Sequence, residues 1–190
     1  MDFRIFTDSA SDLTPDLITE LDVSVLELKT TLTKPDGTVL DGFSLDYPDF
    51  YNALRAKCTA VTAAYSVGEV IEAVEPLLSA GIDVLFLAFS SGLSASCNSA
   101  KIAAEDLSQK YPDRKFLVLD TLCASLGEGL LVSLLAQGTA PCDAAILAVY
   151  LHGAAGDALT EQYSPLGVRP DDLPREIARQ AARLHACVCQ

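Results

Sequence analysis

Hydroxyl-bearing and small residues gather in four short stretches of the sequence, which are Thr7–Ser11, Thr62–Ser66, Phe89–Ser94 and Asp120–Thr121. Side-chain hydroxyls and backbone N–H groups donate hydrogen bonds without carrying charge, and a glycine lets a ligand approach the backbone closely. Such donors at the positive end of a helix dipole suit a bound anion, for example a carboxylate. Each stretch taken singly also fits an ordinary turn or helix cap. Together they predict an anion-binding site.

The same stretches lack the partners that covalent catalysis requires. A serine nucleophile needs a histidine and an acid within hydrogen-bond reach, but His152 and His185 both lie in the last third of the chain. The order Ser-Gly-Leu-Ser at Ser91–Ser94 differs from the Gly-x-Ser-x-Gly turn of hydrolases, and the glycine motifs that bind phosphate or dinucleotides are missing. We therefore predict no catalytic residue, no metal and no cofactor, and a binding protein rather than an enzyme.

Alternating strands and helices are expected to position these stretches. Short apolar runs predict strands at Phe3–Thr7, Val23–Leu28, Val84–Ala88 and Phe116–Leu119, and a hairpin whose strands are Thr30–Thr33 and Thr38–Leu40. Cap signals predict helices that begin near Thr14, Asp46 and Ser66, the last one ending near Gly81, and a further helix over Ser96–Lys110. This order predicts an α/β fold in which a parallel sheet has helices on both faces.

The predicted topology also locates the site. Ligands of an open parallel sheet bind outside the carboxyl ends of its strands. Three of the four stretches follow such strand ends, and Thr62–Ser66 is predicted to form the loop before the capped helix. From about Ser125 onward the pattern changes, because no strand is predicted and two helices are expected, over Cys142–Leu159 and Asp171–Ala186.

Composition excludes several classes of function. The 190 residues carry a net charge of −13 without a cluster of Lys or Arg, which argues against nucleic acid as a partner. No apolar run reaches the ~18 residues of a membrane span, and the first residues do not have the pattern of a secretory leader, so a cytoplasmic location is expected. The six cysteines match no zinc spacing, and Cys97, Cys123 and Cys142 are expected in the core.

The four stretches, in this order, resemble the DegV family of bacterial fatty-acid-binding proteins. The resemblance runs from Phe3 to about Val132 and rests on Phe6–Leu13, Phe50-Tyr51, Phe89–Ala100, Leu119–Thr121 and Gly127–Leu130. It implies a DegV-like α/β lipid-binding domain over residues 1–132. It also implies a long-chain fatty acid in a tunnel between two domains, its carboxylate held by hydroxyls, and a fatty-acid kinase as the partner that receives it.

The resemblance also implies which residues bind the ligand. Thr62 matches the threonine of the family's Thr-Ser-Gln-Pro-Ser loop, and Ser94 matches the serine of its Leu-Ser-Gly loop. The full predicted set is Thr62, Ser94, Ser91, Gly92, Asp8 and Ser9. The sequence departs from the family at Ala63-Ala64-Tyr65, which replace Ser-Gln-Pro, and at Ala95, which replaces the glycine. The family's second domain, with a histidine that helps to hold the carboxylate, has no counterpart in this sequence.

The remaining residues, 133–190, are predicted to form a helical tail. Leu134–Leu184 resembles the last helices of the ADP-dependent NAD(P)H-hydrate dehydratases, which have a ribokinase-like fold. The matching stretches are Leu135–Gly138, Asp143–Asp157 and Asp171–Leu173. Two alternatives to fatty-acid binding follow: the chain is a fragment of a dehydratase-type enzyme, or it is a fusion without function.

Overall fold

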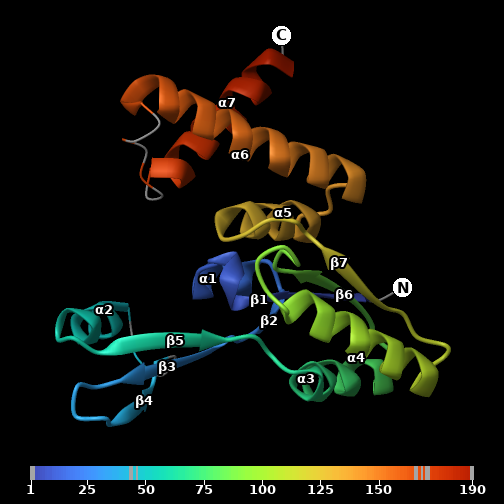
Figure 1. Cartoon of the computed structure of the whole chain (residues 1–190). Coiled ribbons are helices and arrows are strands. Elements are labelled where there is room, and N and C mark those ends of the chain that lie inside the picture. Colours follow the sequence, from blue (N-terminus) through green and yellow to red (C-terminus); the bar gives the residue numbers. More distant parts are fainter. Residues whose placement is uncertain are drawn as a thin grey trace. The chain divides into compact units, whose positions relative to one another are not determined.

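The computed structural model describes residues 3–42, 45, 47–164, 167, 169 and 172–188 (Figure 1). The chain divides into two compact units. The first unit comprises residues 1–10 and 22–123, and the second comprises residues 11–21 and 124–190. The predicted boundary between residues 132 and 133 falls inside a helix of the second unit, α5 (Leu126–Ala136).

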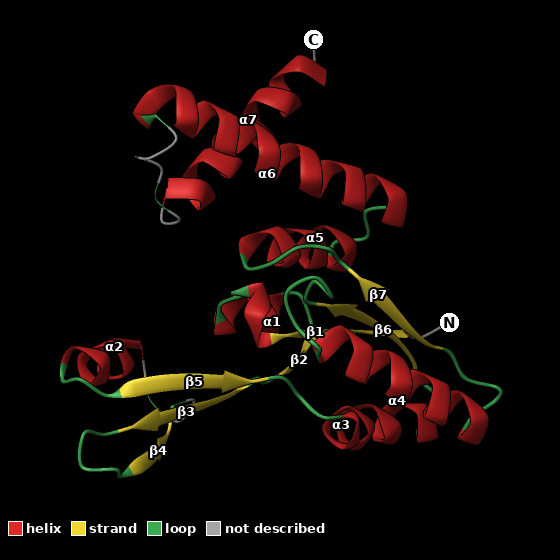
Figure 2. Cartoon of the chain, viewed as in Figure 1, coloured by secondary structure: helices red, strands yellow, loops and turns green. Residues whose placement is uncertain are grey.

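A four-stranded parallel sheet forms the centre of the first unit (Figure 2). Its strands lie in the order β2-β1-β6-β7, with bounds β1 (Phe3–Asp8), β2 (Ser24–Leu26), β6 (Asp83–Ala88) and β7 (Phe116–Asp120). Asp8 lies opposite Leu26, and Ala88 lies opposite Asp120. Since all three pairings are parallel, the carboxyl ends of these strands meet at one edge of the sheet.

Two helices pack on one face of this sheet, α3 (Val67–Ser79) and α4 (Ser96–Lys110). The predicted capping box begins α3: the Ser66 hydroxyl accepts the Glu69 N–H, and the Glu69 carboxylate accepts the Ser66 N–H at 2.7 Å. Apolar side chains at helical spacing then face alternate residues of the strands. The resulting core consists of Phe6, Tyr65, Val70, Val74, Leu78, Val84, Phe86, Ala88, Cys97, Ala100, Ala103, Leu107 and Phe116.

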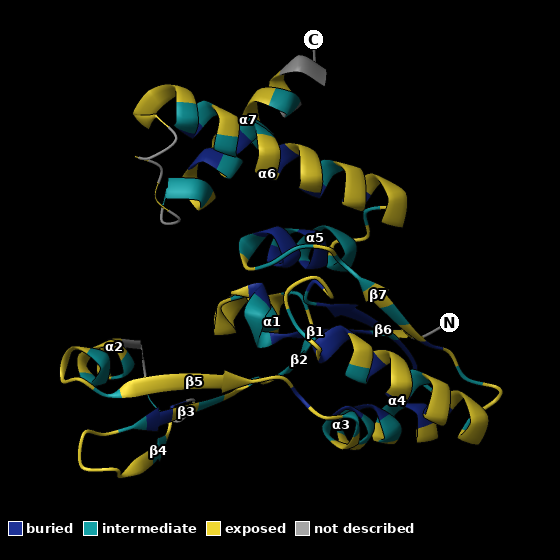
Figure 3. Ribbon diagram, viewed as in Figure 1, coloured by how far each residue is buried: buried dark blue, intermediate teal, exposed yellow. Residues whose placement is uncertain are grey.

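A smaller antiparallel sheet completes the first unit, together with α2 (Tyr47–Arg55). Its strands lie in the order β4-β3-β5, with bounds β3 (Lys29–Thr33), β4 (Val39–Asp41) and β5 (Thr59–Ala63). The predicted hairpin joins β3 to β4, and Gly37 adopts the positive φ (85°) that its turn requires. Of the residues in these three strands, Leu32 alone is buried, and every residue of β5 is exposed (Figure 3).

The second unit is helical. It contains α1 (Pro15–Glu20), α5, α6 (Pro141–Tyr163) and α7 (Leu173–Val188), and α6 packs against both α5 and α7. Gly129 lies in the first part of α5, where a Cβ atom would come within 2.3 Å of the Ser11 carbonyl oxygen. Glycine is therefore required at this position for α5 to approach the segment that precedes α1.

The predicted α/β class is confirmed, with three local corrections. The helix α5 was not predicted, although the two later helices were. Thr62 belongs to strand β5 rather than to a loop. Cys97 is buried as predicted, whereas Cys123 is half-buried and Cys142 is exposed on α6, so neither of these two is a core residue. Asp46, near which a helix was predicted to begin, and Asp171, the first residue of the second predicted tail helix, lie outside the described residues.

Candidate functional site

Asp8 and Ser9 tie the end of β1 to neighbouring segments of the first unit. The Asp8 side chain is fully buried; its Oδ1 accepts the Ala10 N–H at 3.0 Å, and its Oδ2 accepts the Phe89 N–H at 3.1 Å. The Ser9 hydroxyl accepts the Leu28 N–H at 3.0 Å. Burial raises the pKa of Asp8 above its ordinary value, although these hydrogen bonds oppose the shift.

The segment after β6 forms a tight turn built on Ser90. The Ser90 carbonyl accepts the N–H groups of Leu93 and Ser94, at 3.0 and 3.1 Å, and its hydroxyl accepts the Gly92 N–H at 3.2 Å. A Cβ atom on Gly92 would meet the Ser90 hydroxyl at 3.5 Å, an ordinary contact. The turn therefore gets its shape from the buried Ser90, and it would also accommodate a side chain at position 92.

Asp120, at the end of β7, holds the same turn from the other side. Its Oδ1 accepts the N–H groups of Ser91 and Leu122, each at 3.1 Å. The hydrogen bond from the Ser91 side chain, followed by those from the two N–H groups, lowers the pKa of Asp120. The Thr121 hydroxyl donates to the Ala88 carbonyl at 2.8 Å. The predicted residues Ser91 and Gly92 are thus exposed on a turn with fixed ends.

Ser94 stands at the beginning of α4. Its half-buried hydroxyl donates to the Ser96 hydroxyl at 2.9 Å and accepts the Ser96 N–H at 3.1 Å. The N-cap residue is Ala95, which has no side-chain oxygen with which to cap the helix. The first N–H groups of a helix have no partner within the helix and carry its partial positive charge. This helix end therefore offers an anion both a hydroxyl and a favourable potential.

Thr62 lies apart from this network of hydrogen bonds. It is exposed on β5, opposite Thr30 of β3. Among the described residues, no hydrogen bond joins Thr62 to Ser94 or to the other four predicted ligand residues. Five members of the predicted set thus lie at or just after the ends of β1 and β6, at one edge of the larger sheet, and the sixth belongs to the smaller sheet.

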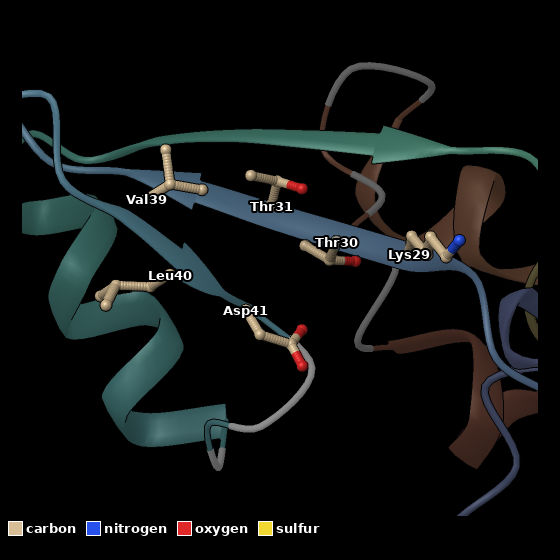
Figure 4. A pocket seen from close by; sticks show the side chains of 6 residues that line it. All are labelled: Lys29, Thr30, Thr31, Val39, Leu40 and Asp41. Carbon is tan, nitrogen blue, oxygen red and sulfur yellow. The ribbon is translucent and has the colours of Figure 1, made fainter.

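An open cavity of about 360 Å³ also lies on the smaller sheet (Figure 4). It is lined by Lys29, Thr30, Thr31, Val39, Leu40 and Asp41. None of the six predicted ligand residues lines it. Its Lys29 ammonium is paired with the Glu69 carboxylate, so the positive charge at its rim is already balanced.

Sequence reasoning missed two residues that shape the site. Tyr65 is buried and its hydroxyl lies 3.4 Å from Oδ2 of Asp8, a contact between residues 57 positions apart. Ser96 is fully buried beneath Ser94. Local spacing carries no signal for the first contact, whereas the serine pair at positions 94 and 96 could have indicated the second.

The described residues contain no group of three or more His, Cys, Asp or Glu side chains that could hold a metal ion. Within the same residues, no helix is long and apolar enough to cross a membrane. His152 is exposed on α6, in the second unit.

About the first three quarters of the chain match known proteins of one family. The family model described as "Uncharacterised protein, DegV family" matches residues 2–140. A DegV domain-containing protein of Clostridium perfringens is 40% identical over 135 residues, which are 71% of this chain and 46% of that protein. The chain thus spans about half the length of this curated relative.

Two solved structures share the fold. A stearic acid-binding protein from Eubacterium ventriosum superposes with a TM-score of 0.64 at 22% identity, over 80% of this chain and 54% of that one. A DegV family protein from Thermus thermophilus, described by its fatty acid binding, superposes with a TM-score of 0.58 at 27% identity, over 79% and 53% of the two chains.

Proposed function

Because the chain belongs to the DegV family, we propose that it binds a long-chain fatty acid and holds the carboxylate through hydroxyl groups. The solved relatives from Eubacterium ventriosum and Thermus thermophilus carry fatty-acid binding in their descriptions. The observation that carries the proposal is the half-buried Ser94 hydroxyl at the beginning of α4, beside an N-cap residue, Ala95, that has no side-chain oxygen of its own.

In this proposal some residues contact the carboxylate, and others hold the segments that carry those residues. The Ser94 hydroxyl turns its proton from the Ser96 hydroxyl to one carboxylate oxygen, and the dipole of α4 favours the negative charge. Ser91 and Gly92, whose N–H groups bond to Asp120 and to the Ser90 hydroxyl, form the exposed turn beside the carboxylate. Thr62 contributes its hydroxyl from β5 and approaches the ligand from the smaller sheet. Ser9 and Asp8 belong to the same set and fix the strand end beside the turn.

In this proposal the protein binds the fatty acid without reacting with it. A nucleophile would need a neighbouring base, and the hydroxyls of Ser94 and Thr121 bond to the Ser96 hydroxyl and to the Ala88 carbonyl instead. Transfer of the bound fatty acid to a partner kinase follows from the family resemblance. The chain spans about half the length of its curated relative. We therefore propose, rather than observe, an enclosed tunnel for the fatty acid and a contact with the kinase.

The tail keeps its separate interpretation. The family model ends at residue 140, and α6 and α7 both lie beyond it. For residues 133–190, the resemblance to the ADP-dependent NAD(P)H-hydrate dehydratases stays a prediction. Formation of NADH from its hydrate by the purified chain, in the presence of ADP or ATP, would support it.

Mass spectrometry of lipid that copurifies with the chain after bacterial expression tests the proposed function. We expect a fatty acid in the wild-type chain and its loss in the double variant Thr62→Val, Ser94→Ala. The matched control is the double variant Thr59→Val, Ser108→Ala. Thr59 is exposed on the other face of β5, and the Ser108 hydroxyl only bonds within α4.

Two outcomes would contradict the proposal. A folded wild-type chain without lipid, which also fails to take up added oleate, would remove fatty-acid binding. Equal amounts of lipid in the wild type and in the Thr62→Val, Ser94→Ala variant would remove the proposed carboxylate site.

A further inference from the structure

The buried carboxylate of Asp8 joins three segments of the first unit. Its Oδ1 accepts the Ala10 N–H, and its Oδ2 accepts both the Phe89 N–H at 3.1 Å and the Tyr65 hydroxyl at 3.4 Å. Both carboxylate oxygens therefore bond to protein donors, and the side chain is completely removed from solvent. A carboxylate in this environment repels a second carboxylate and offers it no donor. Its hydrogen bonds are better suited to holding chain segments than to contacting the ligand.

The two donors that share Oδ2 belong to the two segments that carry the proposed ligand hydroxyls. Phe89 is the residue immediately before the Ser90 turn, which leads to Ser94. Tyr65 follows Thr62 by three residues and precedes the N-cap of α3. One oxygen atom is thus the direct bridge between the end of β6 and the segment that leaves β5.

We infer that Asp8 and Tyr65 are positioning residues that set the separation between the Thr62 segment and the Ser94 turn. This inference rests on the proposed function, because it assigns the two side chains to the geometry of the carboxylate site. Neither side chain contacts the ligand. Their effect reaches the carboxylate only through Thr62 and Ser94.

The aromatic ring of Tyr65 fixes where its hydroxyl can point. The ring is 2% exposed and meets the Phe86 ring edge-to-face at 5.8 Å, and Phe86 stacks on Phe6 at 5.9 Å. The core therefore anchors the ring to β1 and β6, while the hydroxyl extends to Asp8. The 3.4 Å separation is longer than the ~2.7–2.8 Å typical of O–H···O hydrogen bonds. Because the buried ring keeps its contacts with Phe86 when the hydroxyl alone is removed, loss of the hydroxyl should change the link between the segments more than the stability of the core.

Tyr65→Phe is the direct test, because it removes the hydroxyl and keeps the buried ring. The control is Tyr51→Phe, which removes a hydroxyl from a side chain that is 54% exposed on α2. Amide hydrogen exchange of the full chain without lipid is measured over residues 62–66 and 89–94. We expect Tyr65→Phe to raise exchange in both windows, by about threefold to tenfold for one modest hydrogen bond, and Tyr51→Phe to change neither. A rise confined to residues 62–66, or no rise, would overturn the inference.

Binding separates positioning from a general loss of structure. The affinities for oleate and for oleyl alcohol are measured for wild type, Tyr65→Phe and Tyr51→Phe. Tyr65→Phe should weaken oleate binding by about threefold to tenfold and leave oleyl alcohol binding unchanged, because the two hydroxyl segments act on the carboxylate. An equal loss for both ligands, or no loss for oleate, would contradict the assigned role.

A second variant tests whether both residues act through one link. In the Asp8→Asn background, the addition of Tyr65→Phe should have no further effect on exchange in the two windows. Additive effects would mean that the residues act separately. If Asp8→Asn does not fold, Tyr65→Phe alone decides the question. A wild type that binds no oleate would defeat the proposed function, whereas the exchange experiment would still decide the inference.

Discussion

The two sheets of the first unit differ in how firmly they hold the residues at their edges. The larger sheet has a core on one face and a strand-end turn whose N–H groups bond to Asp8, Ser90 and Asp120. The smaller sheet has Leu32 as the buried residue of its three strands, and β5 is exposed along its whole length. One sheet therefore presents Ser94 on a constrained turn, and the other presents Thr62 on an exposed strand.

This difference suggests that the two sheets have separate roles in binding a carboxylate. The donors beside the larger sheet are fixed before the ligand arrives, so little conformational entropy is lost there on binding. Thr62 belongs to a sheet with few buried contacts, which is the kind of region that moves most easily. We therefore expect the larger sheet to determine where the carboxylate binds and the smaller sheet to close on it.

The largest expected effect is in the core of the larger sheet. Phe86→Ala removes a fully buried ring that packs on both Phe6 and Tyr65, and should lower the free energy of unfolding by about 3–5 kcal/mol. The control is Leu117→Ala on β7, where the side chain is 59% exposed and the loss should be below about 1 kcal/mol. Urea denaturation measures both. Similar losses would mean that the buried core around Phe86 does not determine the stability of the larger sheet.

A smaller and more local effect is expected in the other sheet. Leu32→Ala should remove about 2–4 kcal/mol of local stability, because it deletes the buried side chain of β3. Amide exchange should rise in residues 29–33 and 59–63, while exchange in α4 stays unchanged. Val61→Ala on the exposed β5 serves as the control. An equal rise in α4 would show that the two sheets unfold as one cooperative body, which would contradict the proposed difference in stability between them.

Much of the larger sheet could be predicted because its signals are local. The apolar runs at β1, β6 and β7 and the capping box at Ser66 and Glu69 each depend on residues close in sequence. The ends of parallel strands then follow from topology, which is why the Asp8, Ser90 and Asp120 segments were expected at one edge. The hydroxyl pattern alone could not show which of these residues supports the turn and which faces a ligand.

The remaining differences have identifiable causes. The first turn of the helix α5 contains Gly127 and Gly129, which disfavour a helix by propensity. The contact that requires Gly129 comes from Ser11, far away in sequence. Thr62 was predicted in a loop because the short segment Thr59–Ala63 has no clear alternation of apolar and polar residues. This segment forms a strand because it pairs with β3. The bond between Tyr65 and Asp8 spans 57 residues and has no local signature.

The smallest expected effect distinguishes two carboxylates at the edge of the larger sheet. Burial raises the pKa of Asp8 above 3.8, so the stability it contributes is full below that value and is lost as the pH rises through the folded-state pKa. Hydrogen bonds from Ser91 and Leu122 lower the pKa of Asp120, so its contribution is present above 3.8 and is lost as the pH falls through the lowered pKa.

Urea denaturation of wild type, Asp8→Asn and Asp120→Asn between pH 7 and pH 3 measures these contributions. As the pH falls, the stability advantage of wild type over Asp120→Asn should narrow. The difference between wild type and Asp8→Asn should shift in favour of wild type over the same range. If both differences in the free energy of unfolding changed in the same direction as the pH falls, the environments assigned to Asp8 and Asp120 would be wrong.

A direct titration tests whether hydroxyl groups of this chain hold a fatty-acid carboxylate. Purified wild-type chain is titrated with oleate and with oleyl alcohol, which has a chain of the same length without a carboxylate. We predict that oleate binds at least about tenfold more tightly, and that Ser94→Ala removes most of that difference, since each bond to a charged group contributes about 1.5–3 kcal/mol. Equal affinity for the two ligands, or a difference that Ser94→Ala leaves intact, would contradict the account.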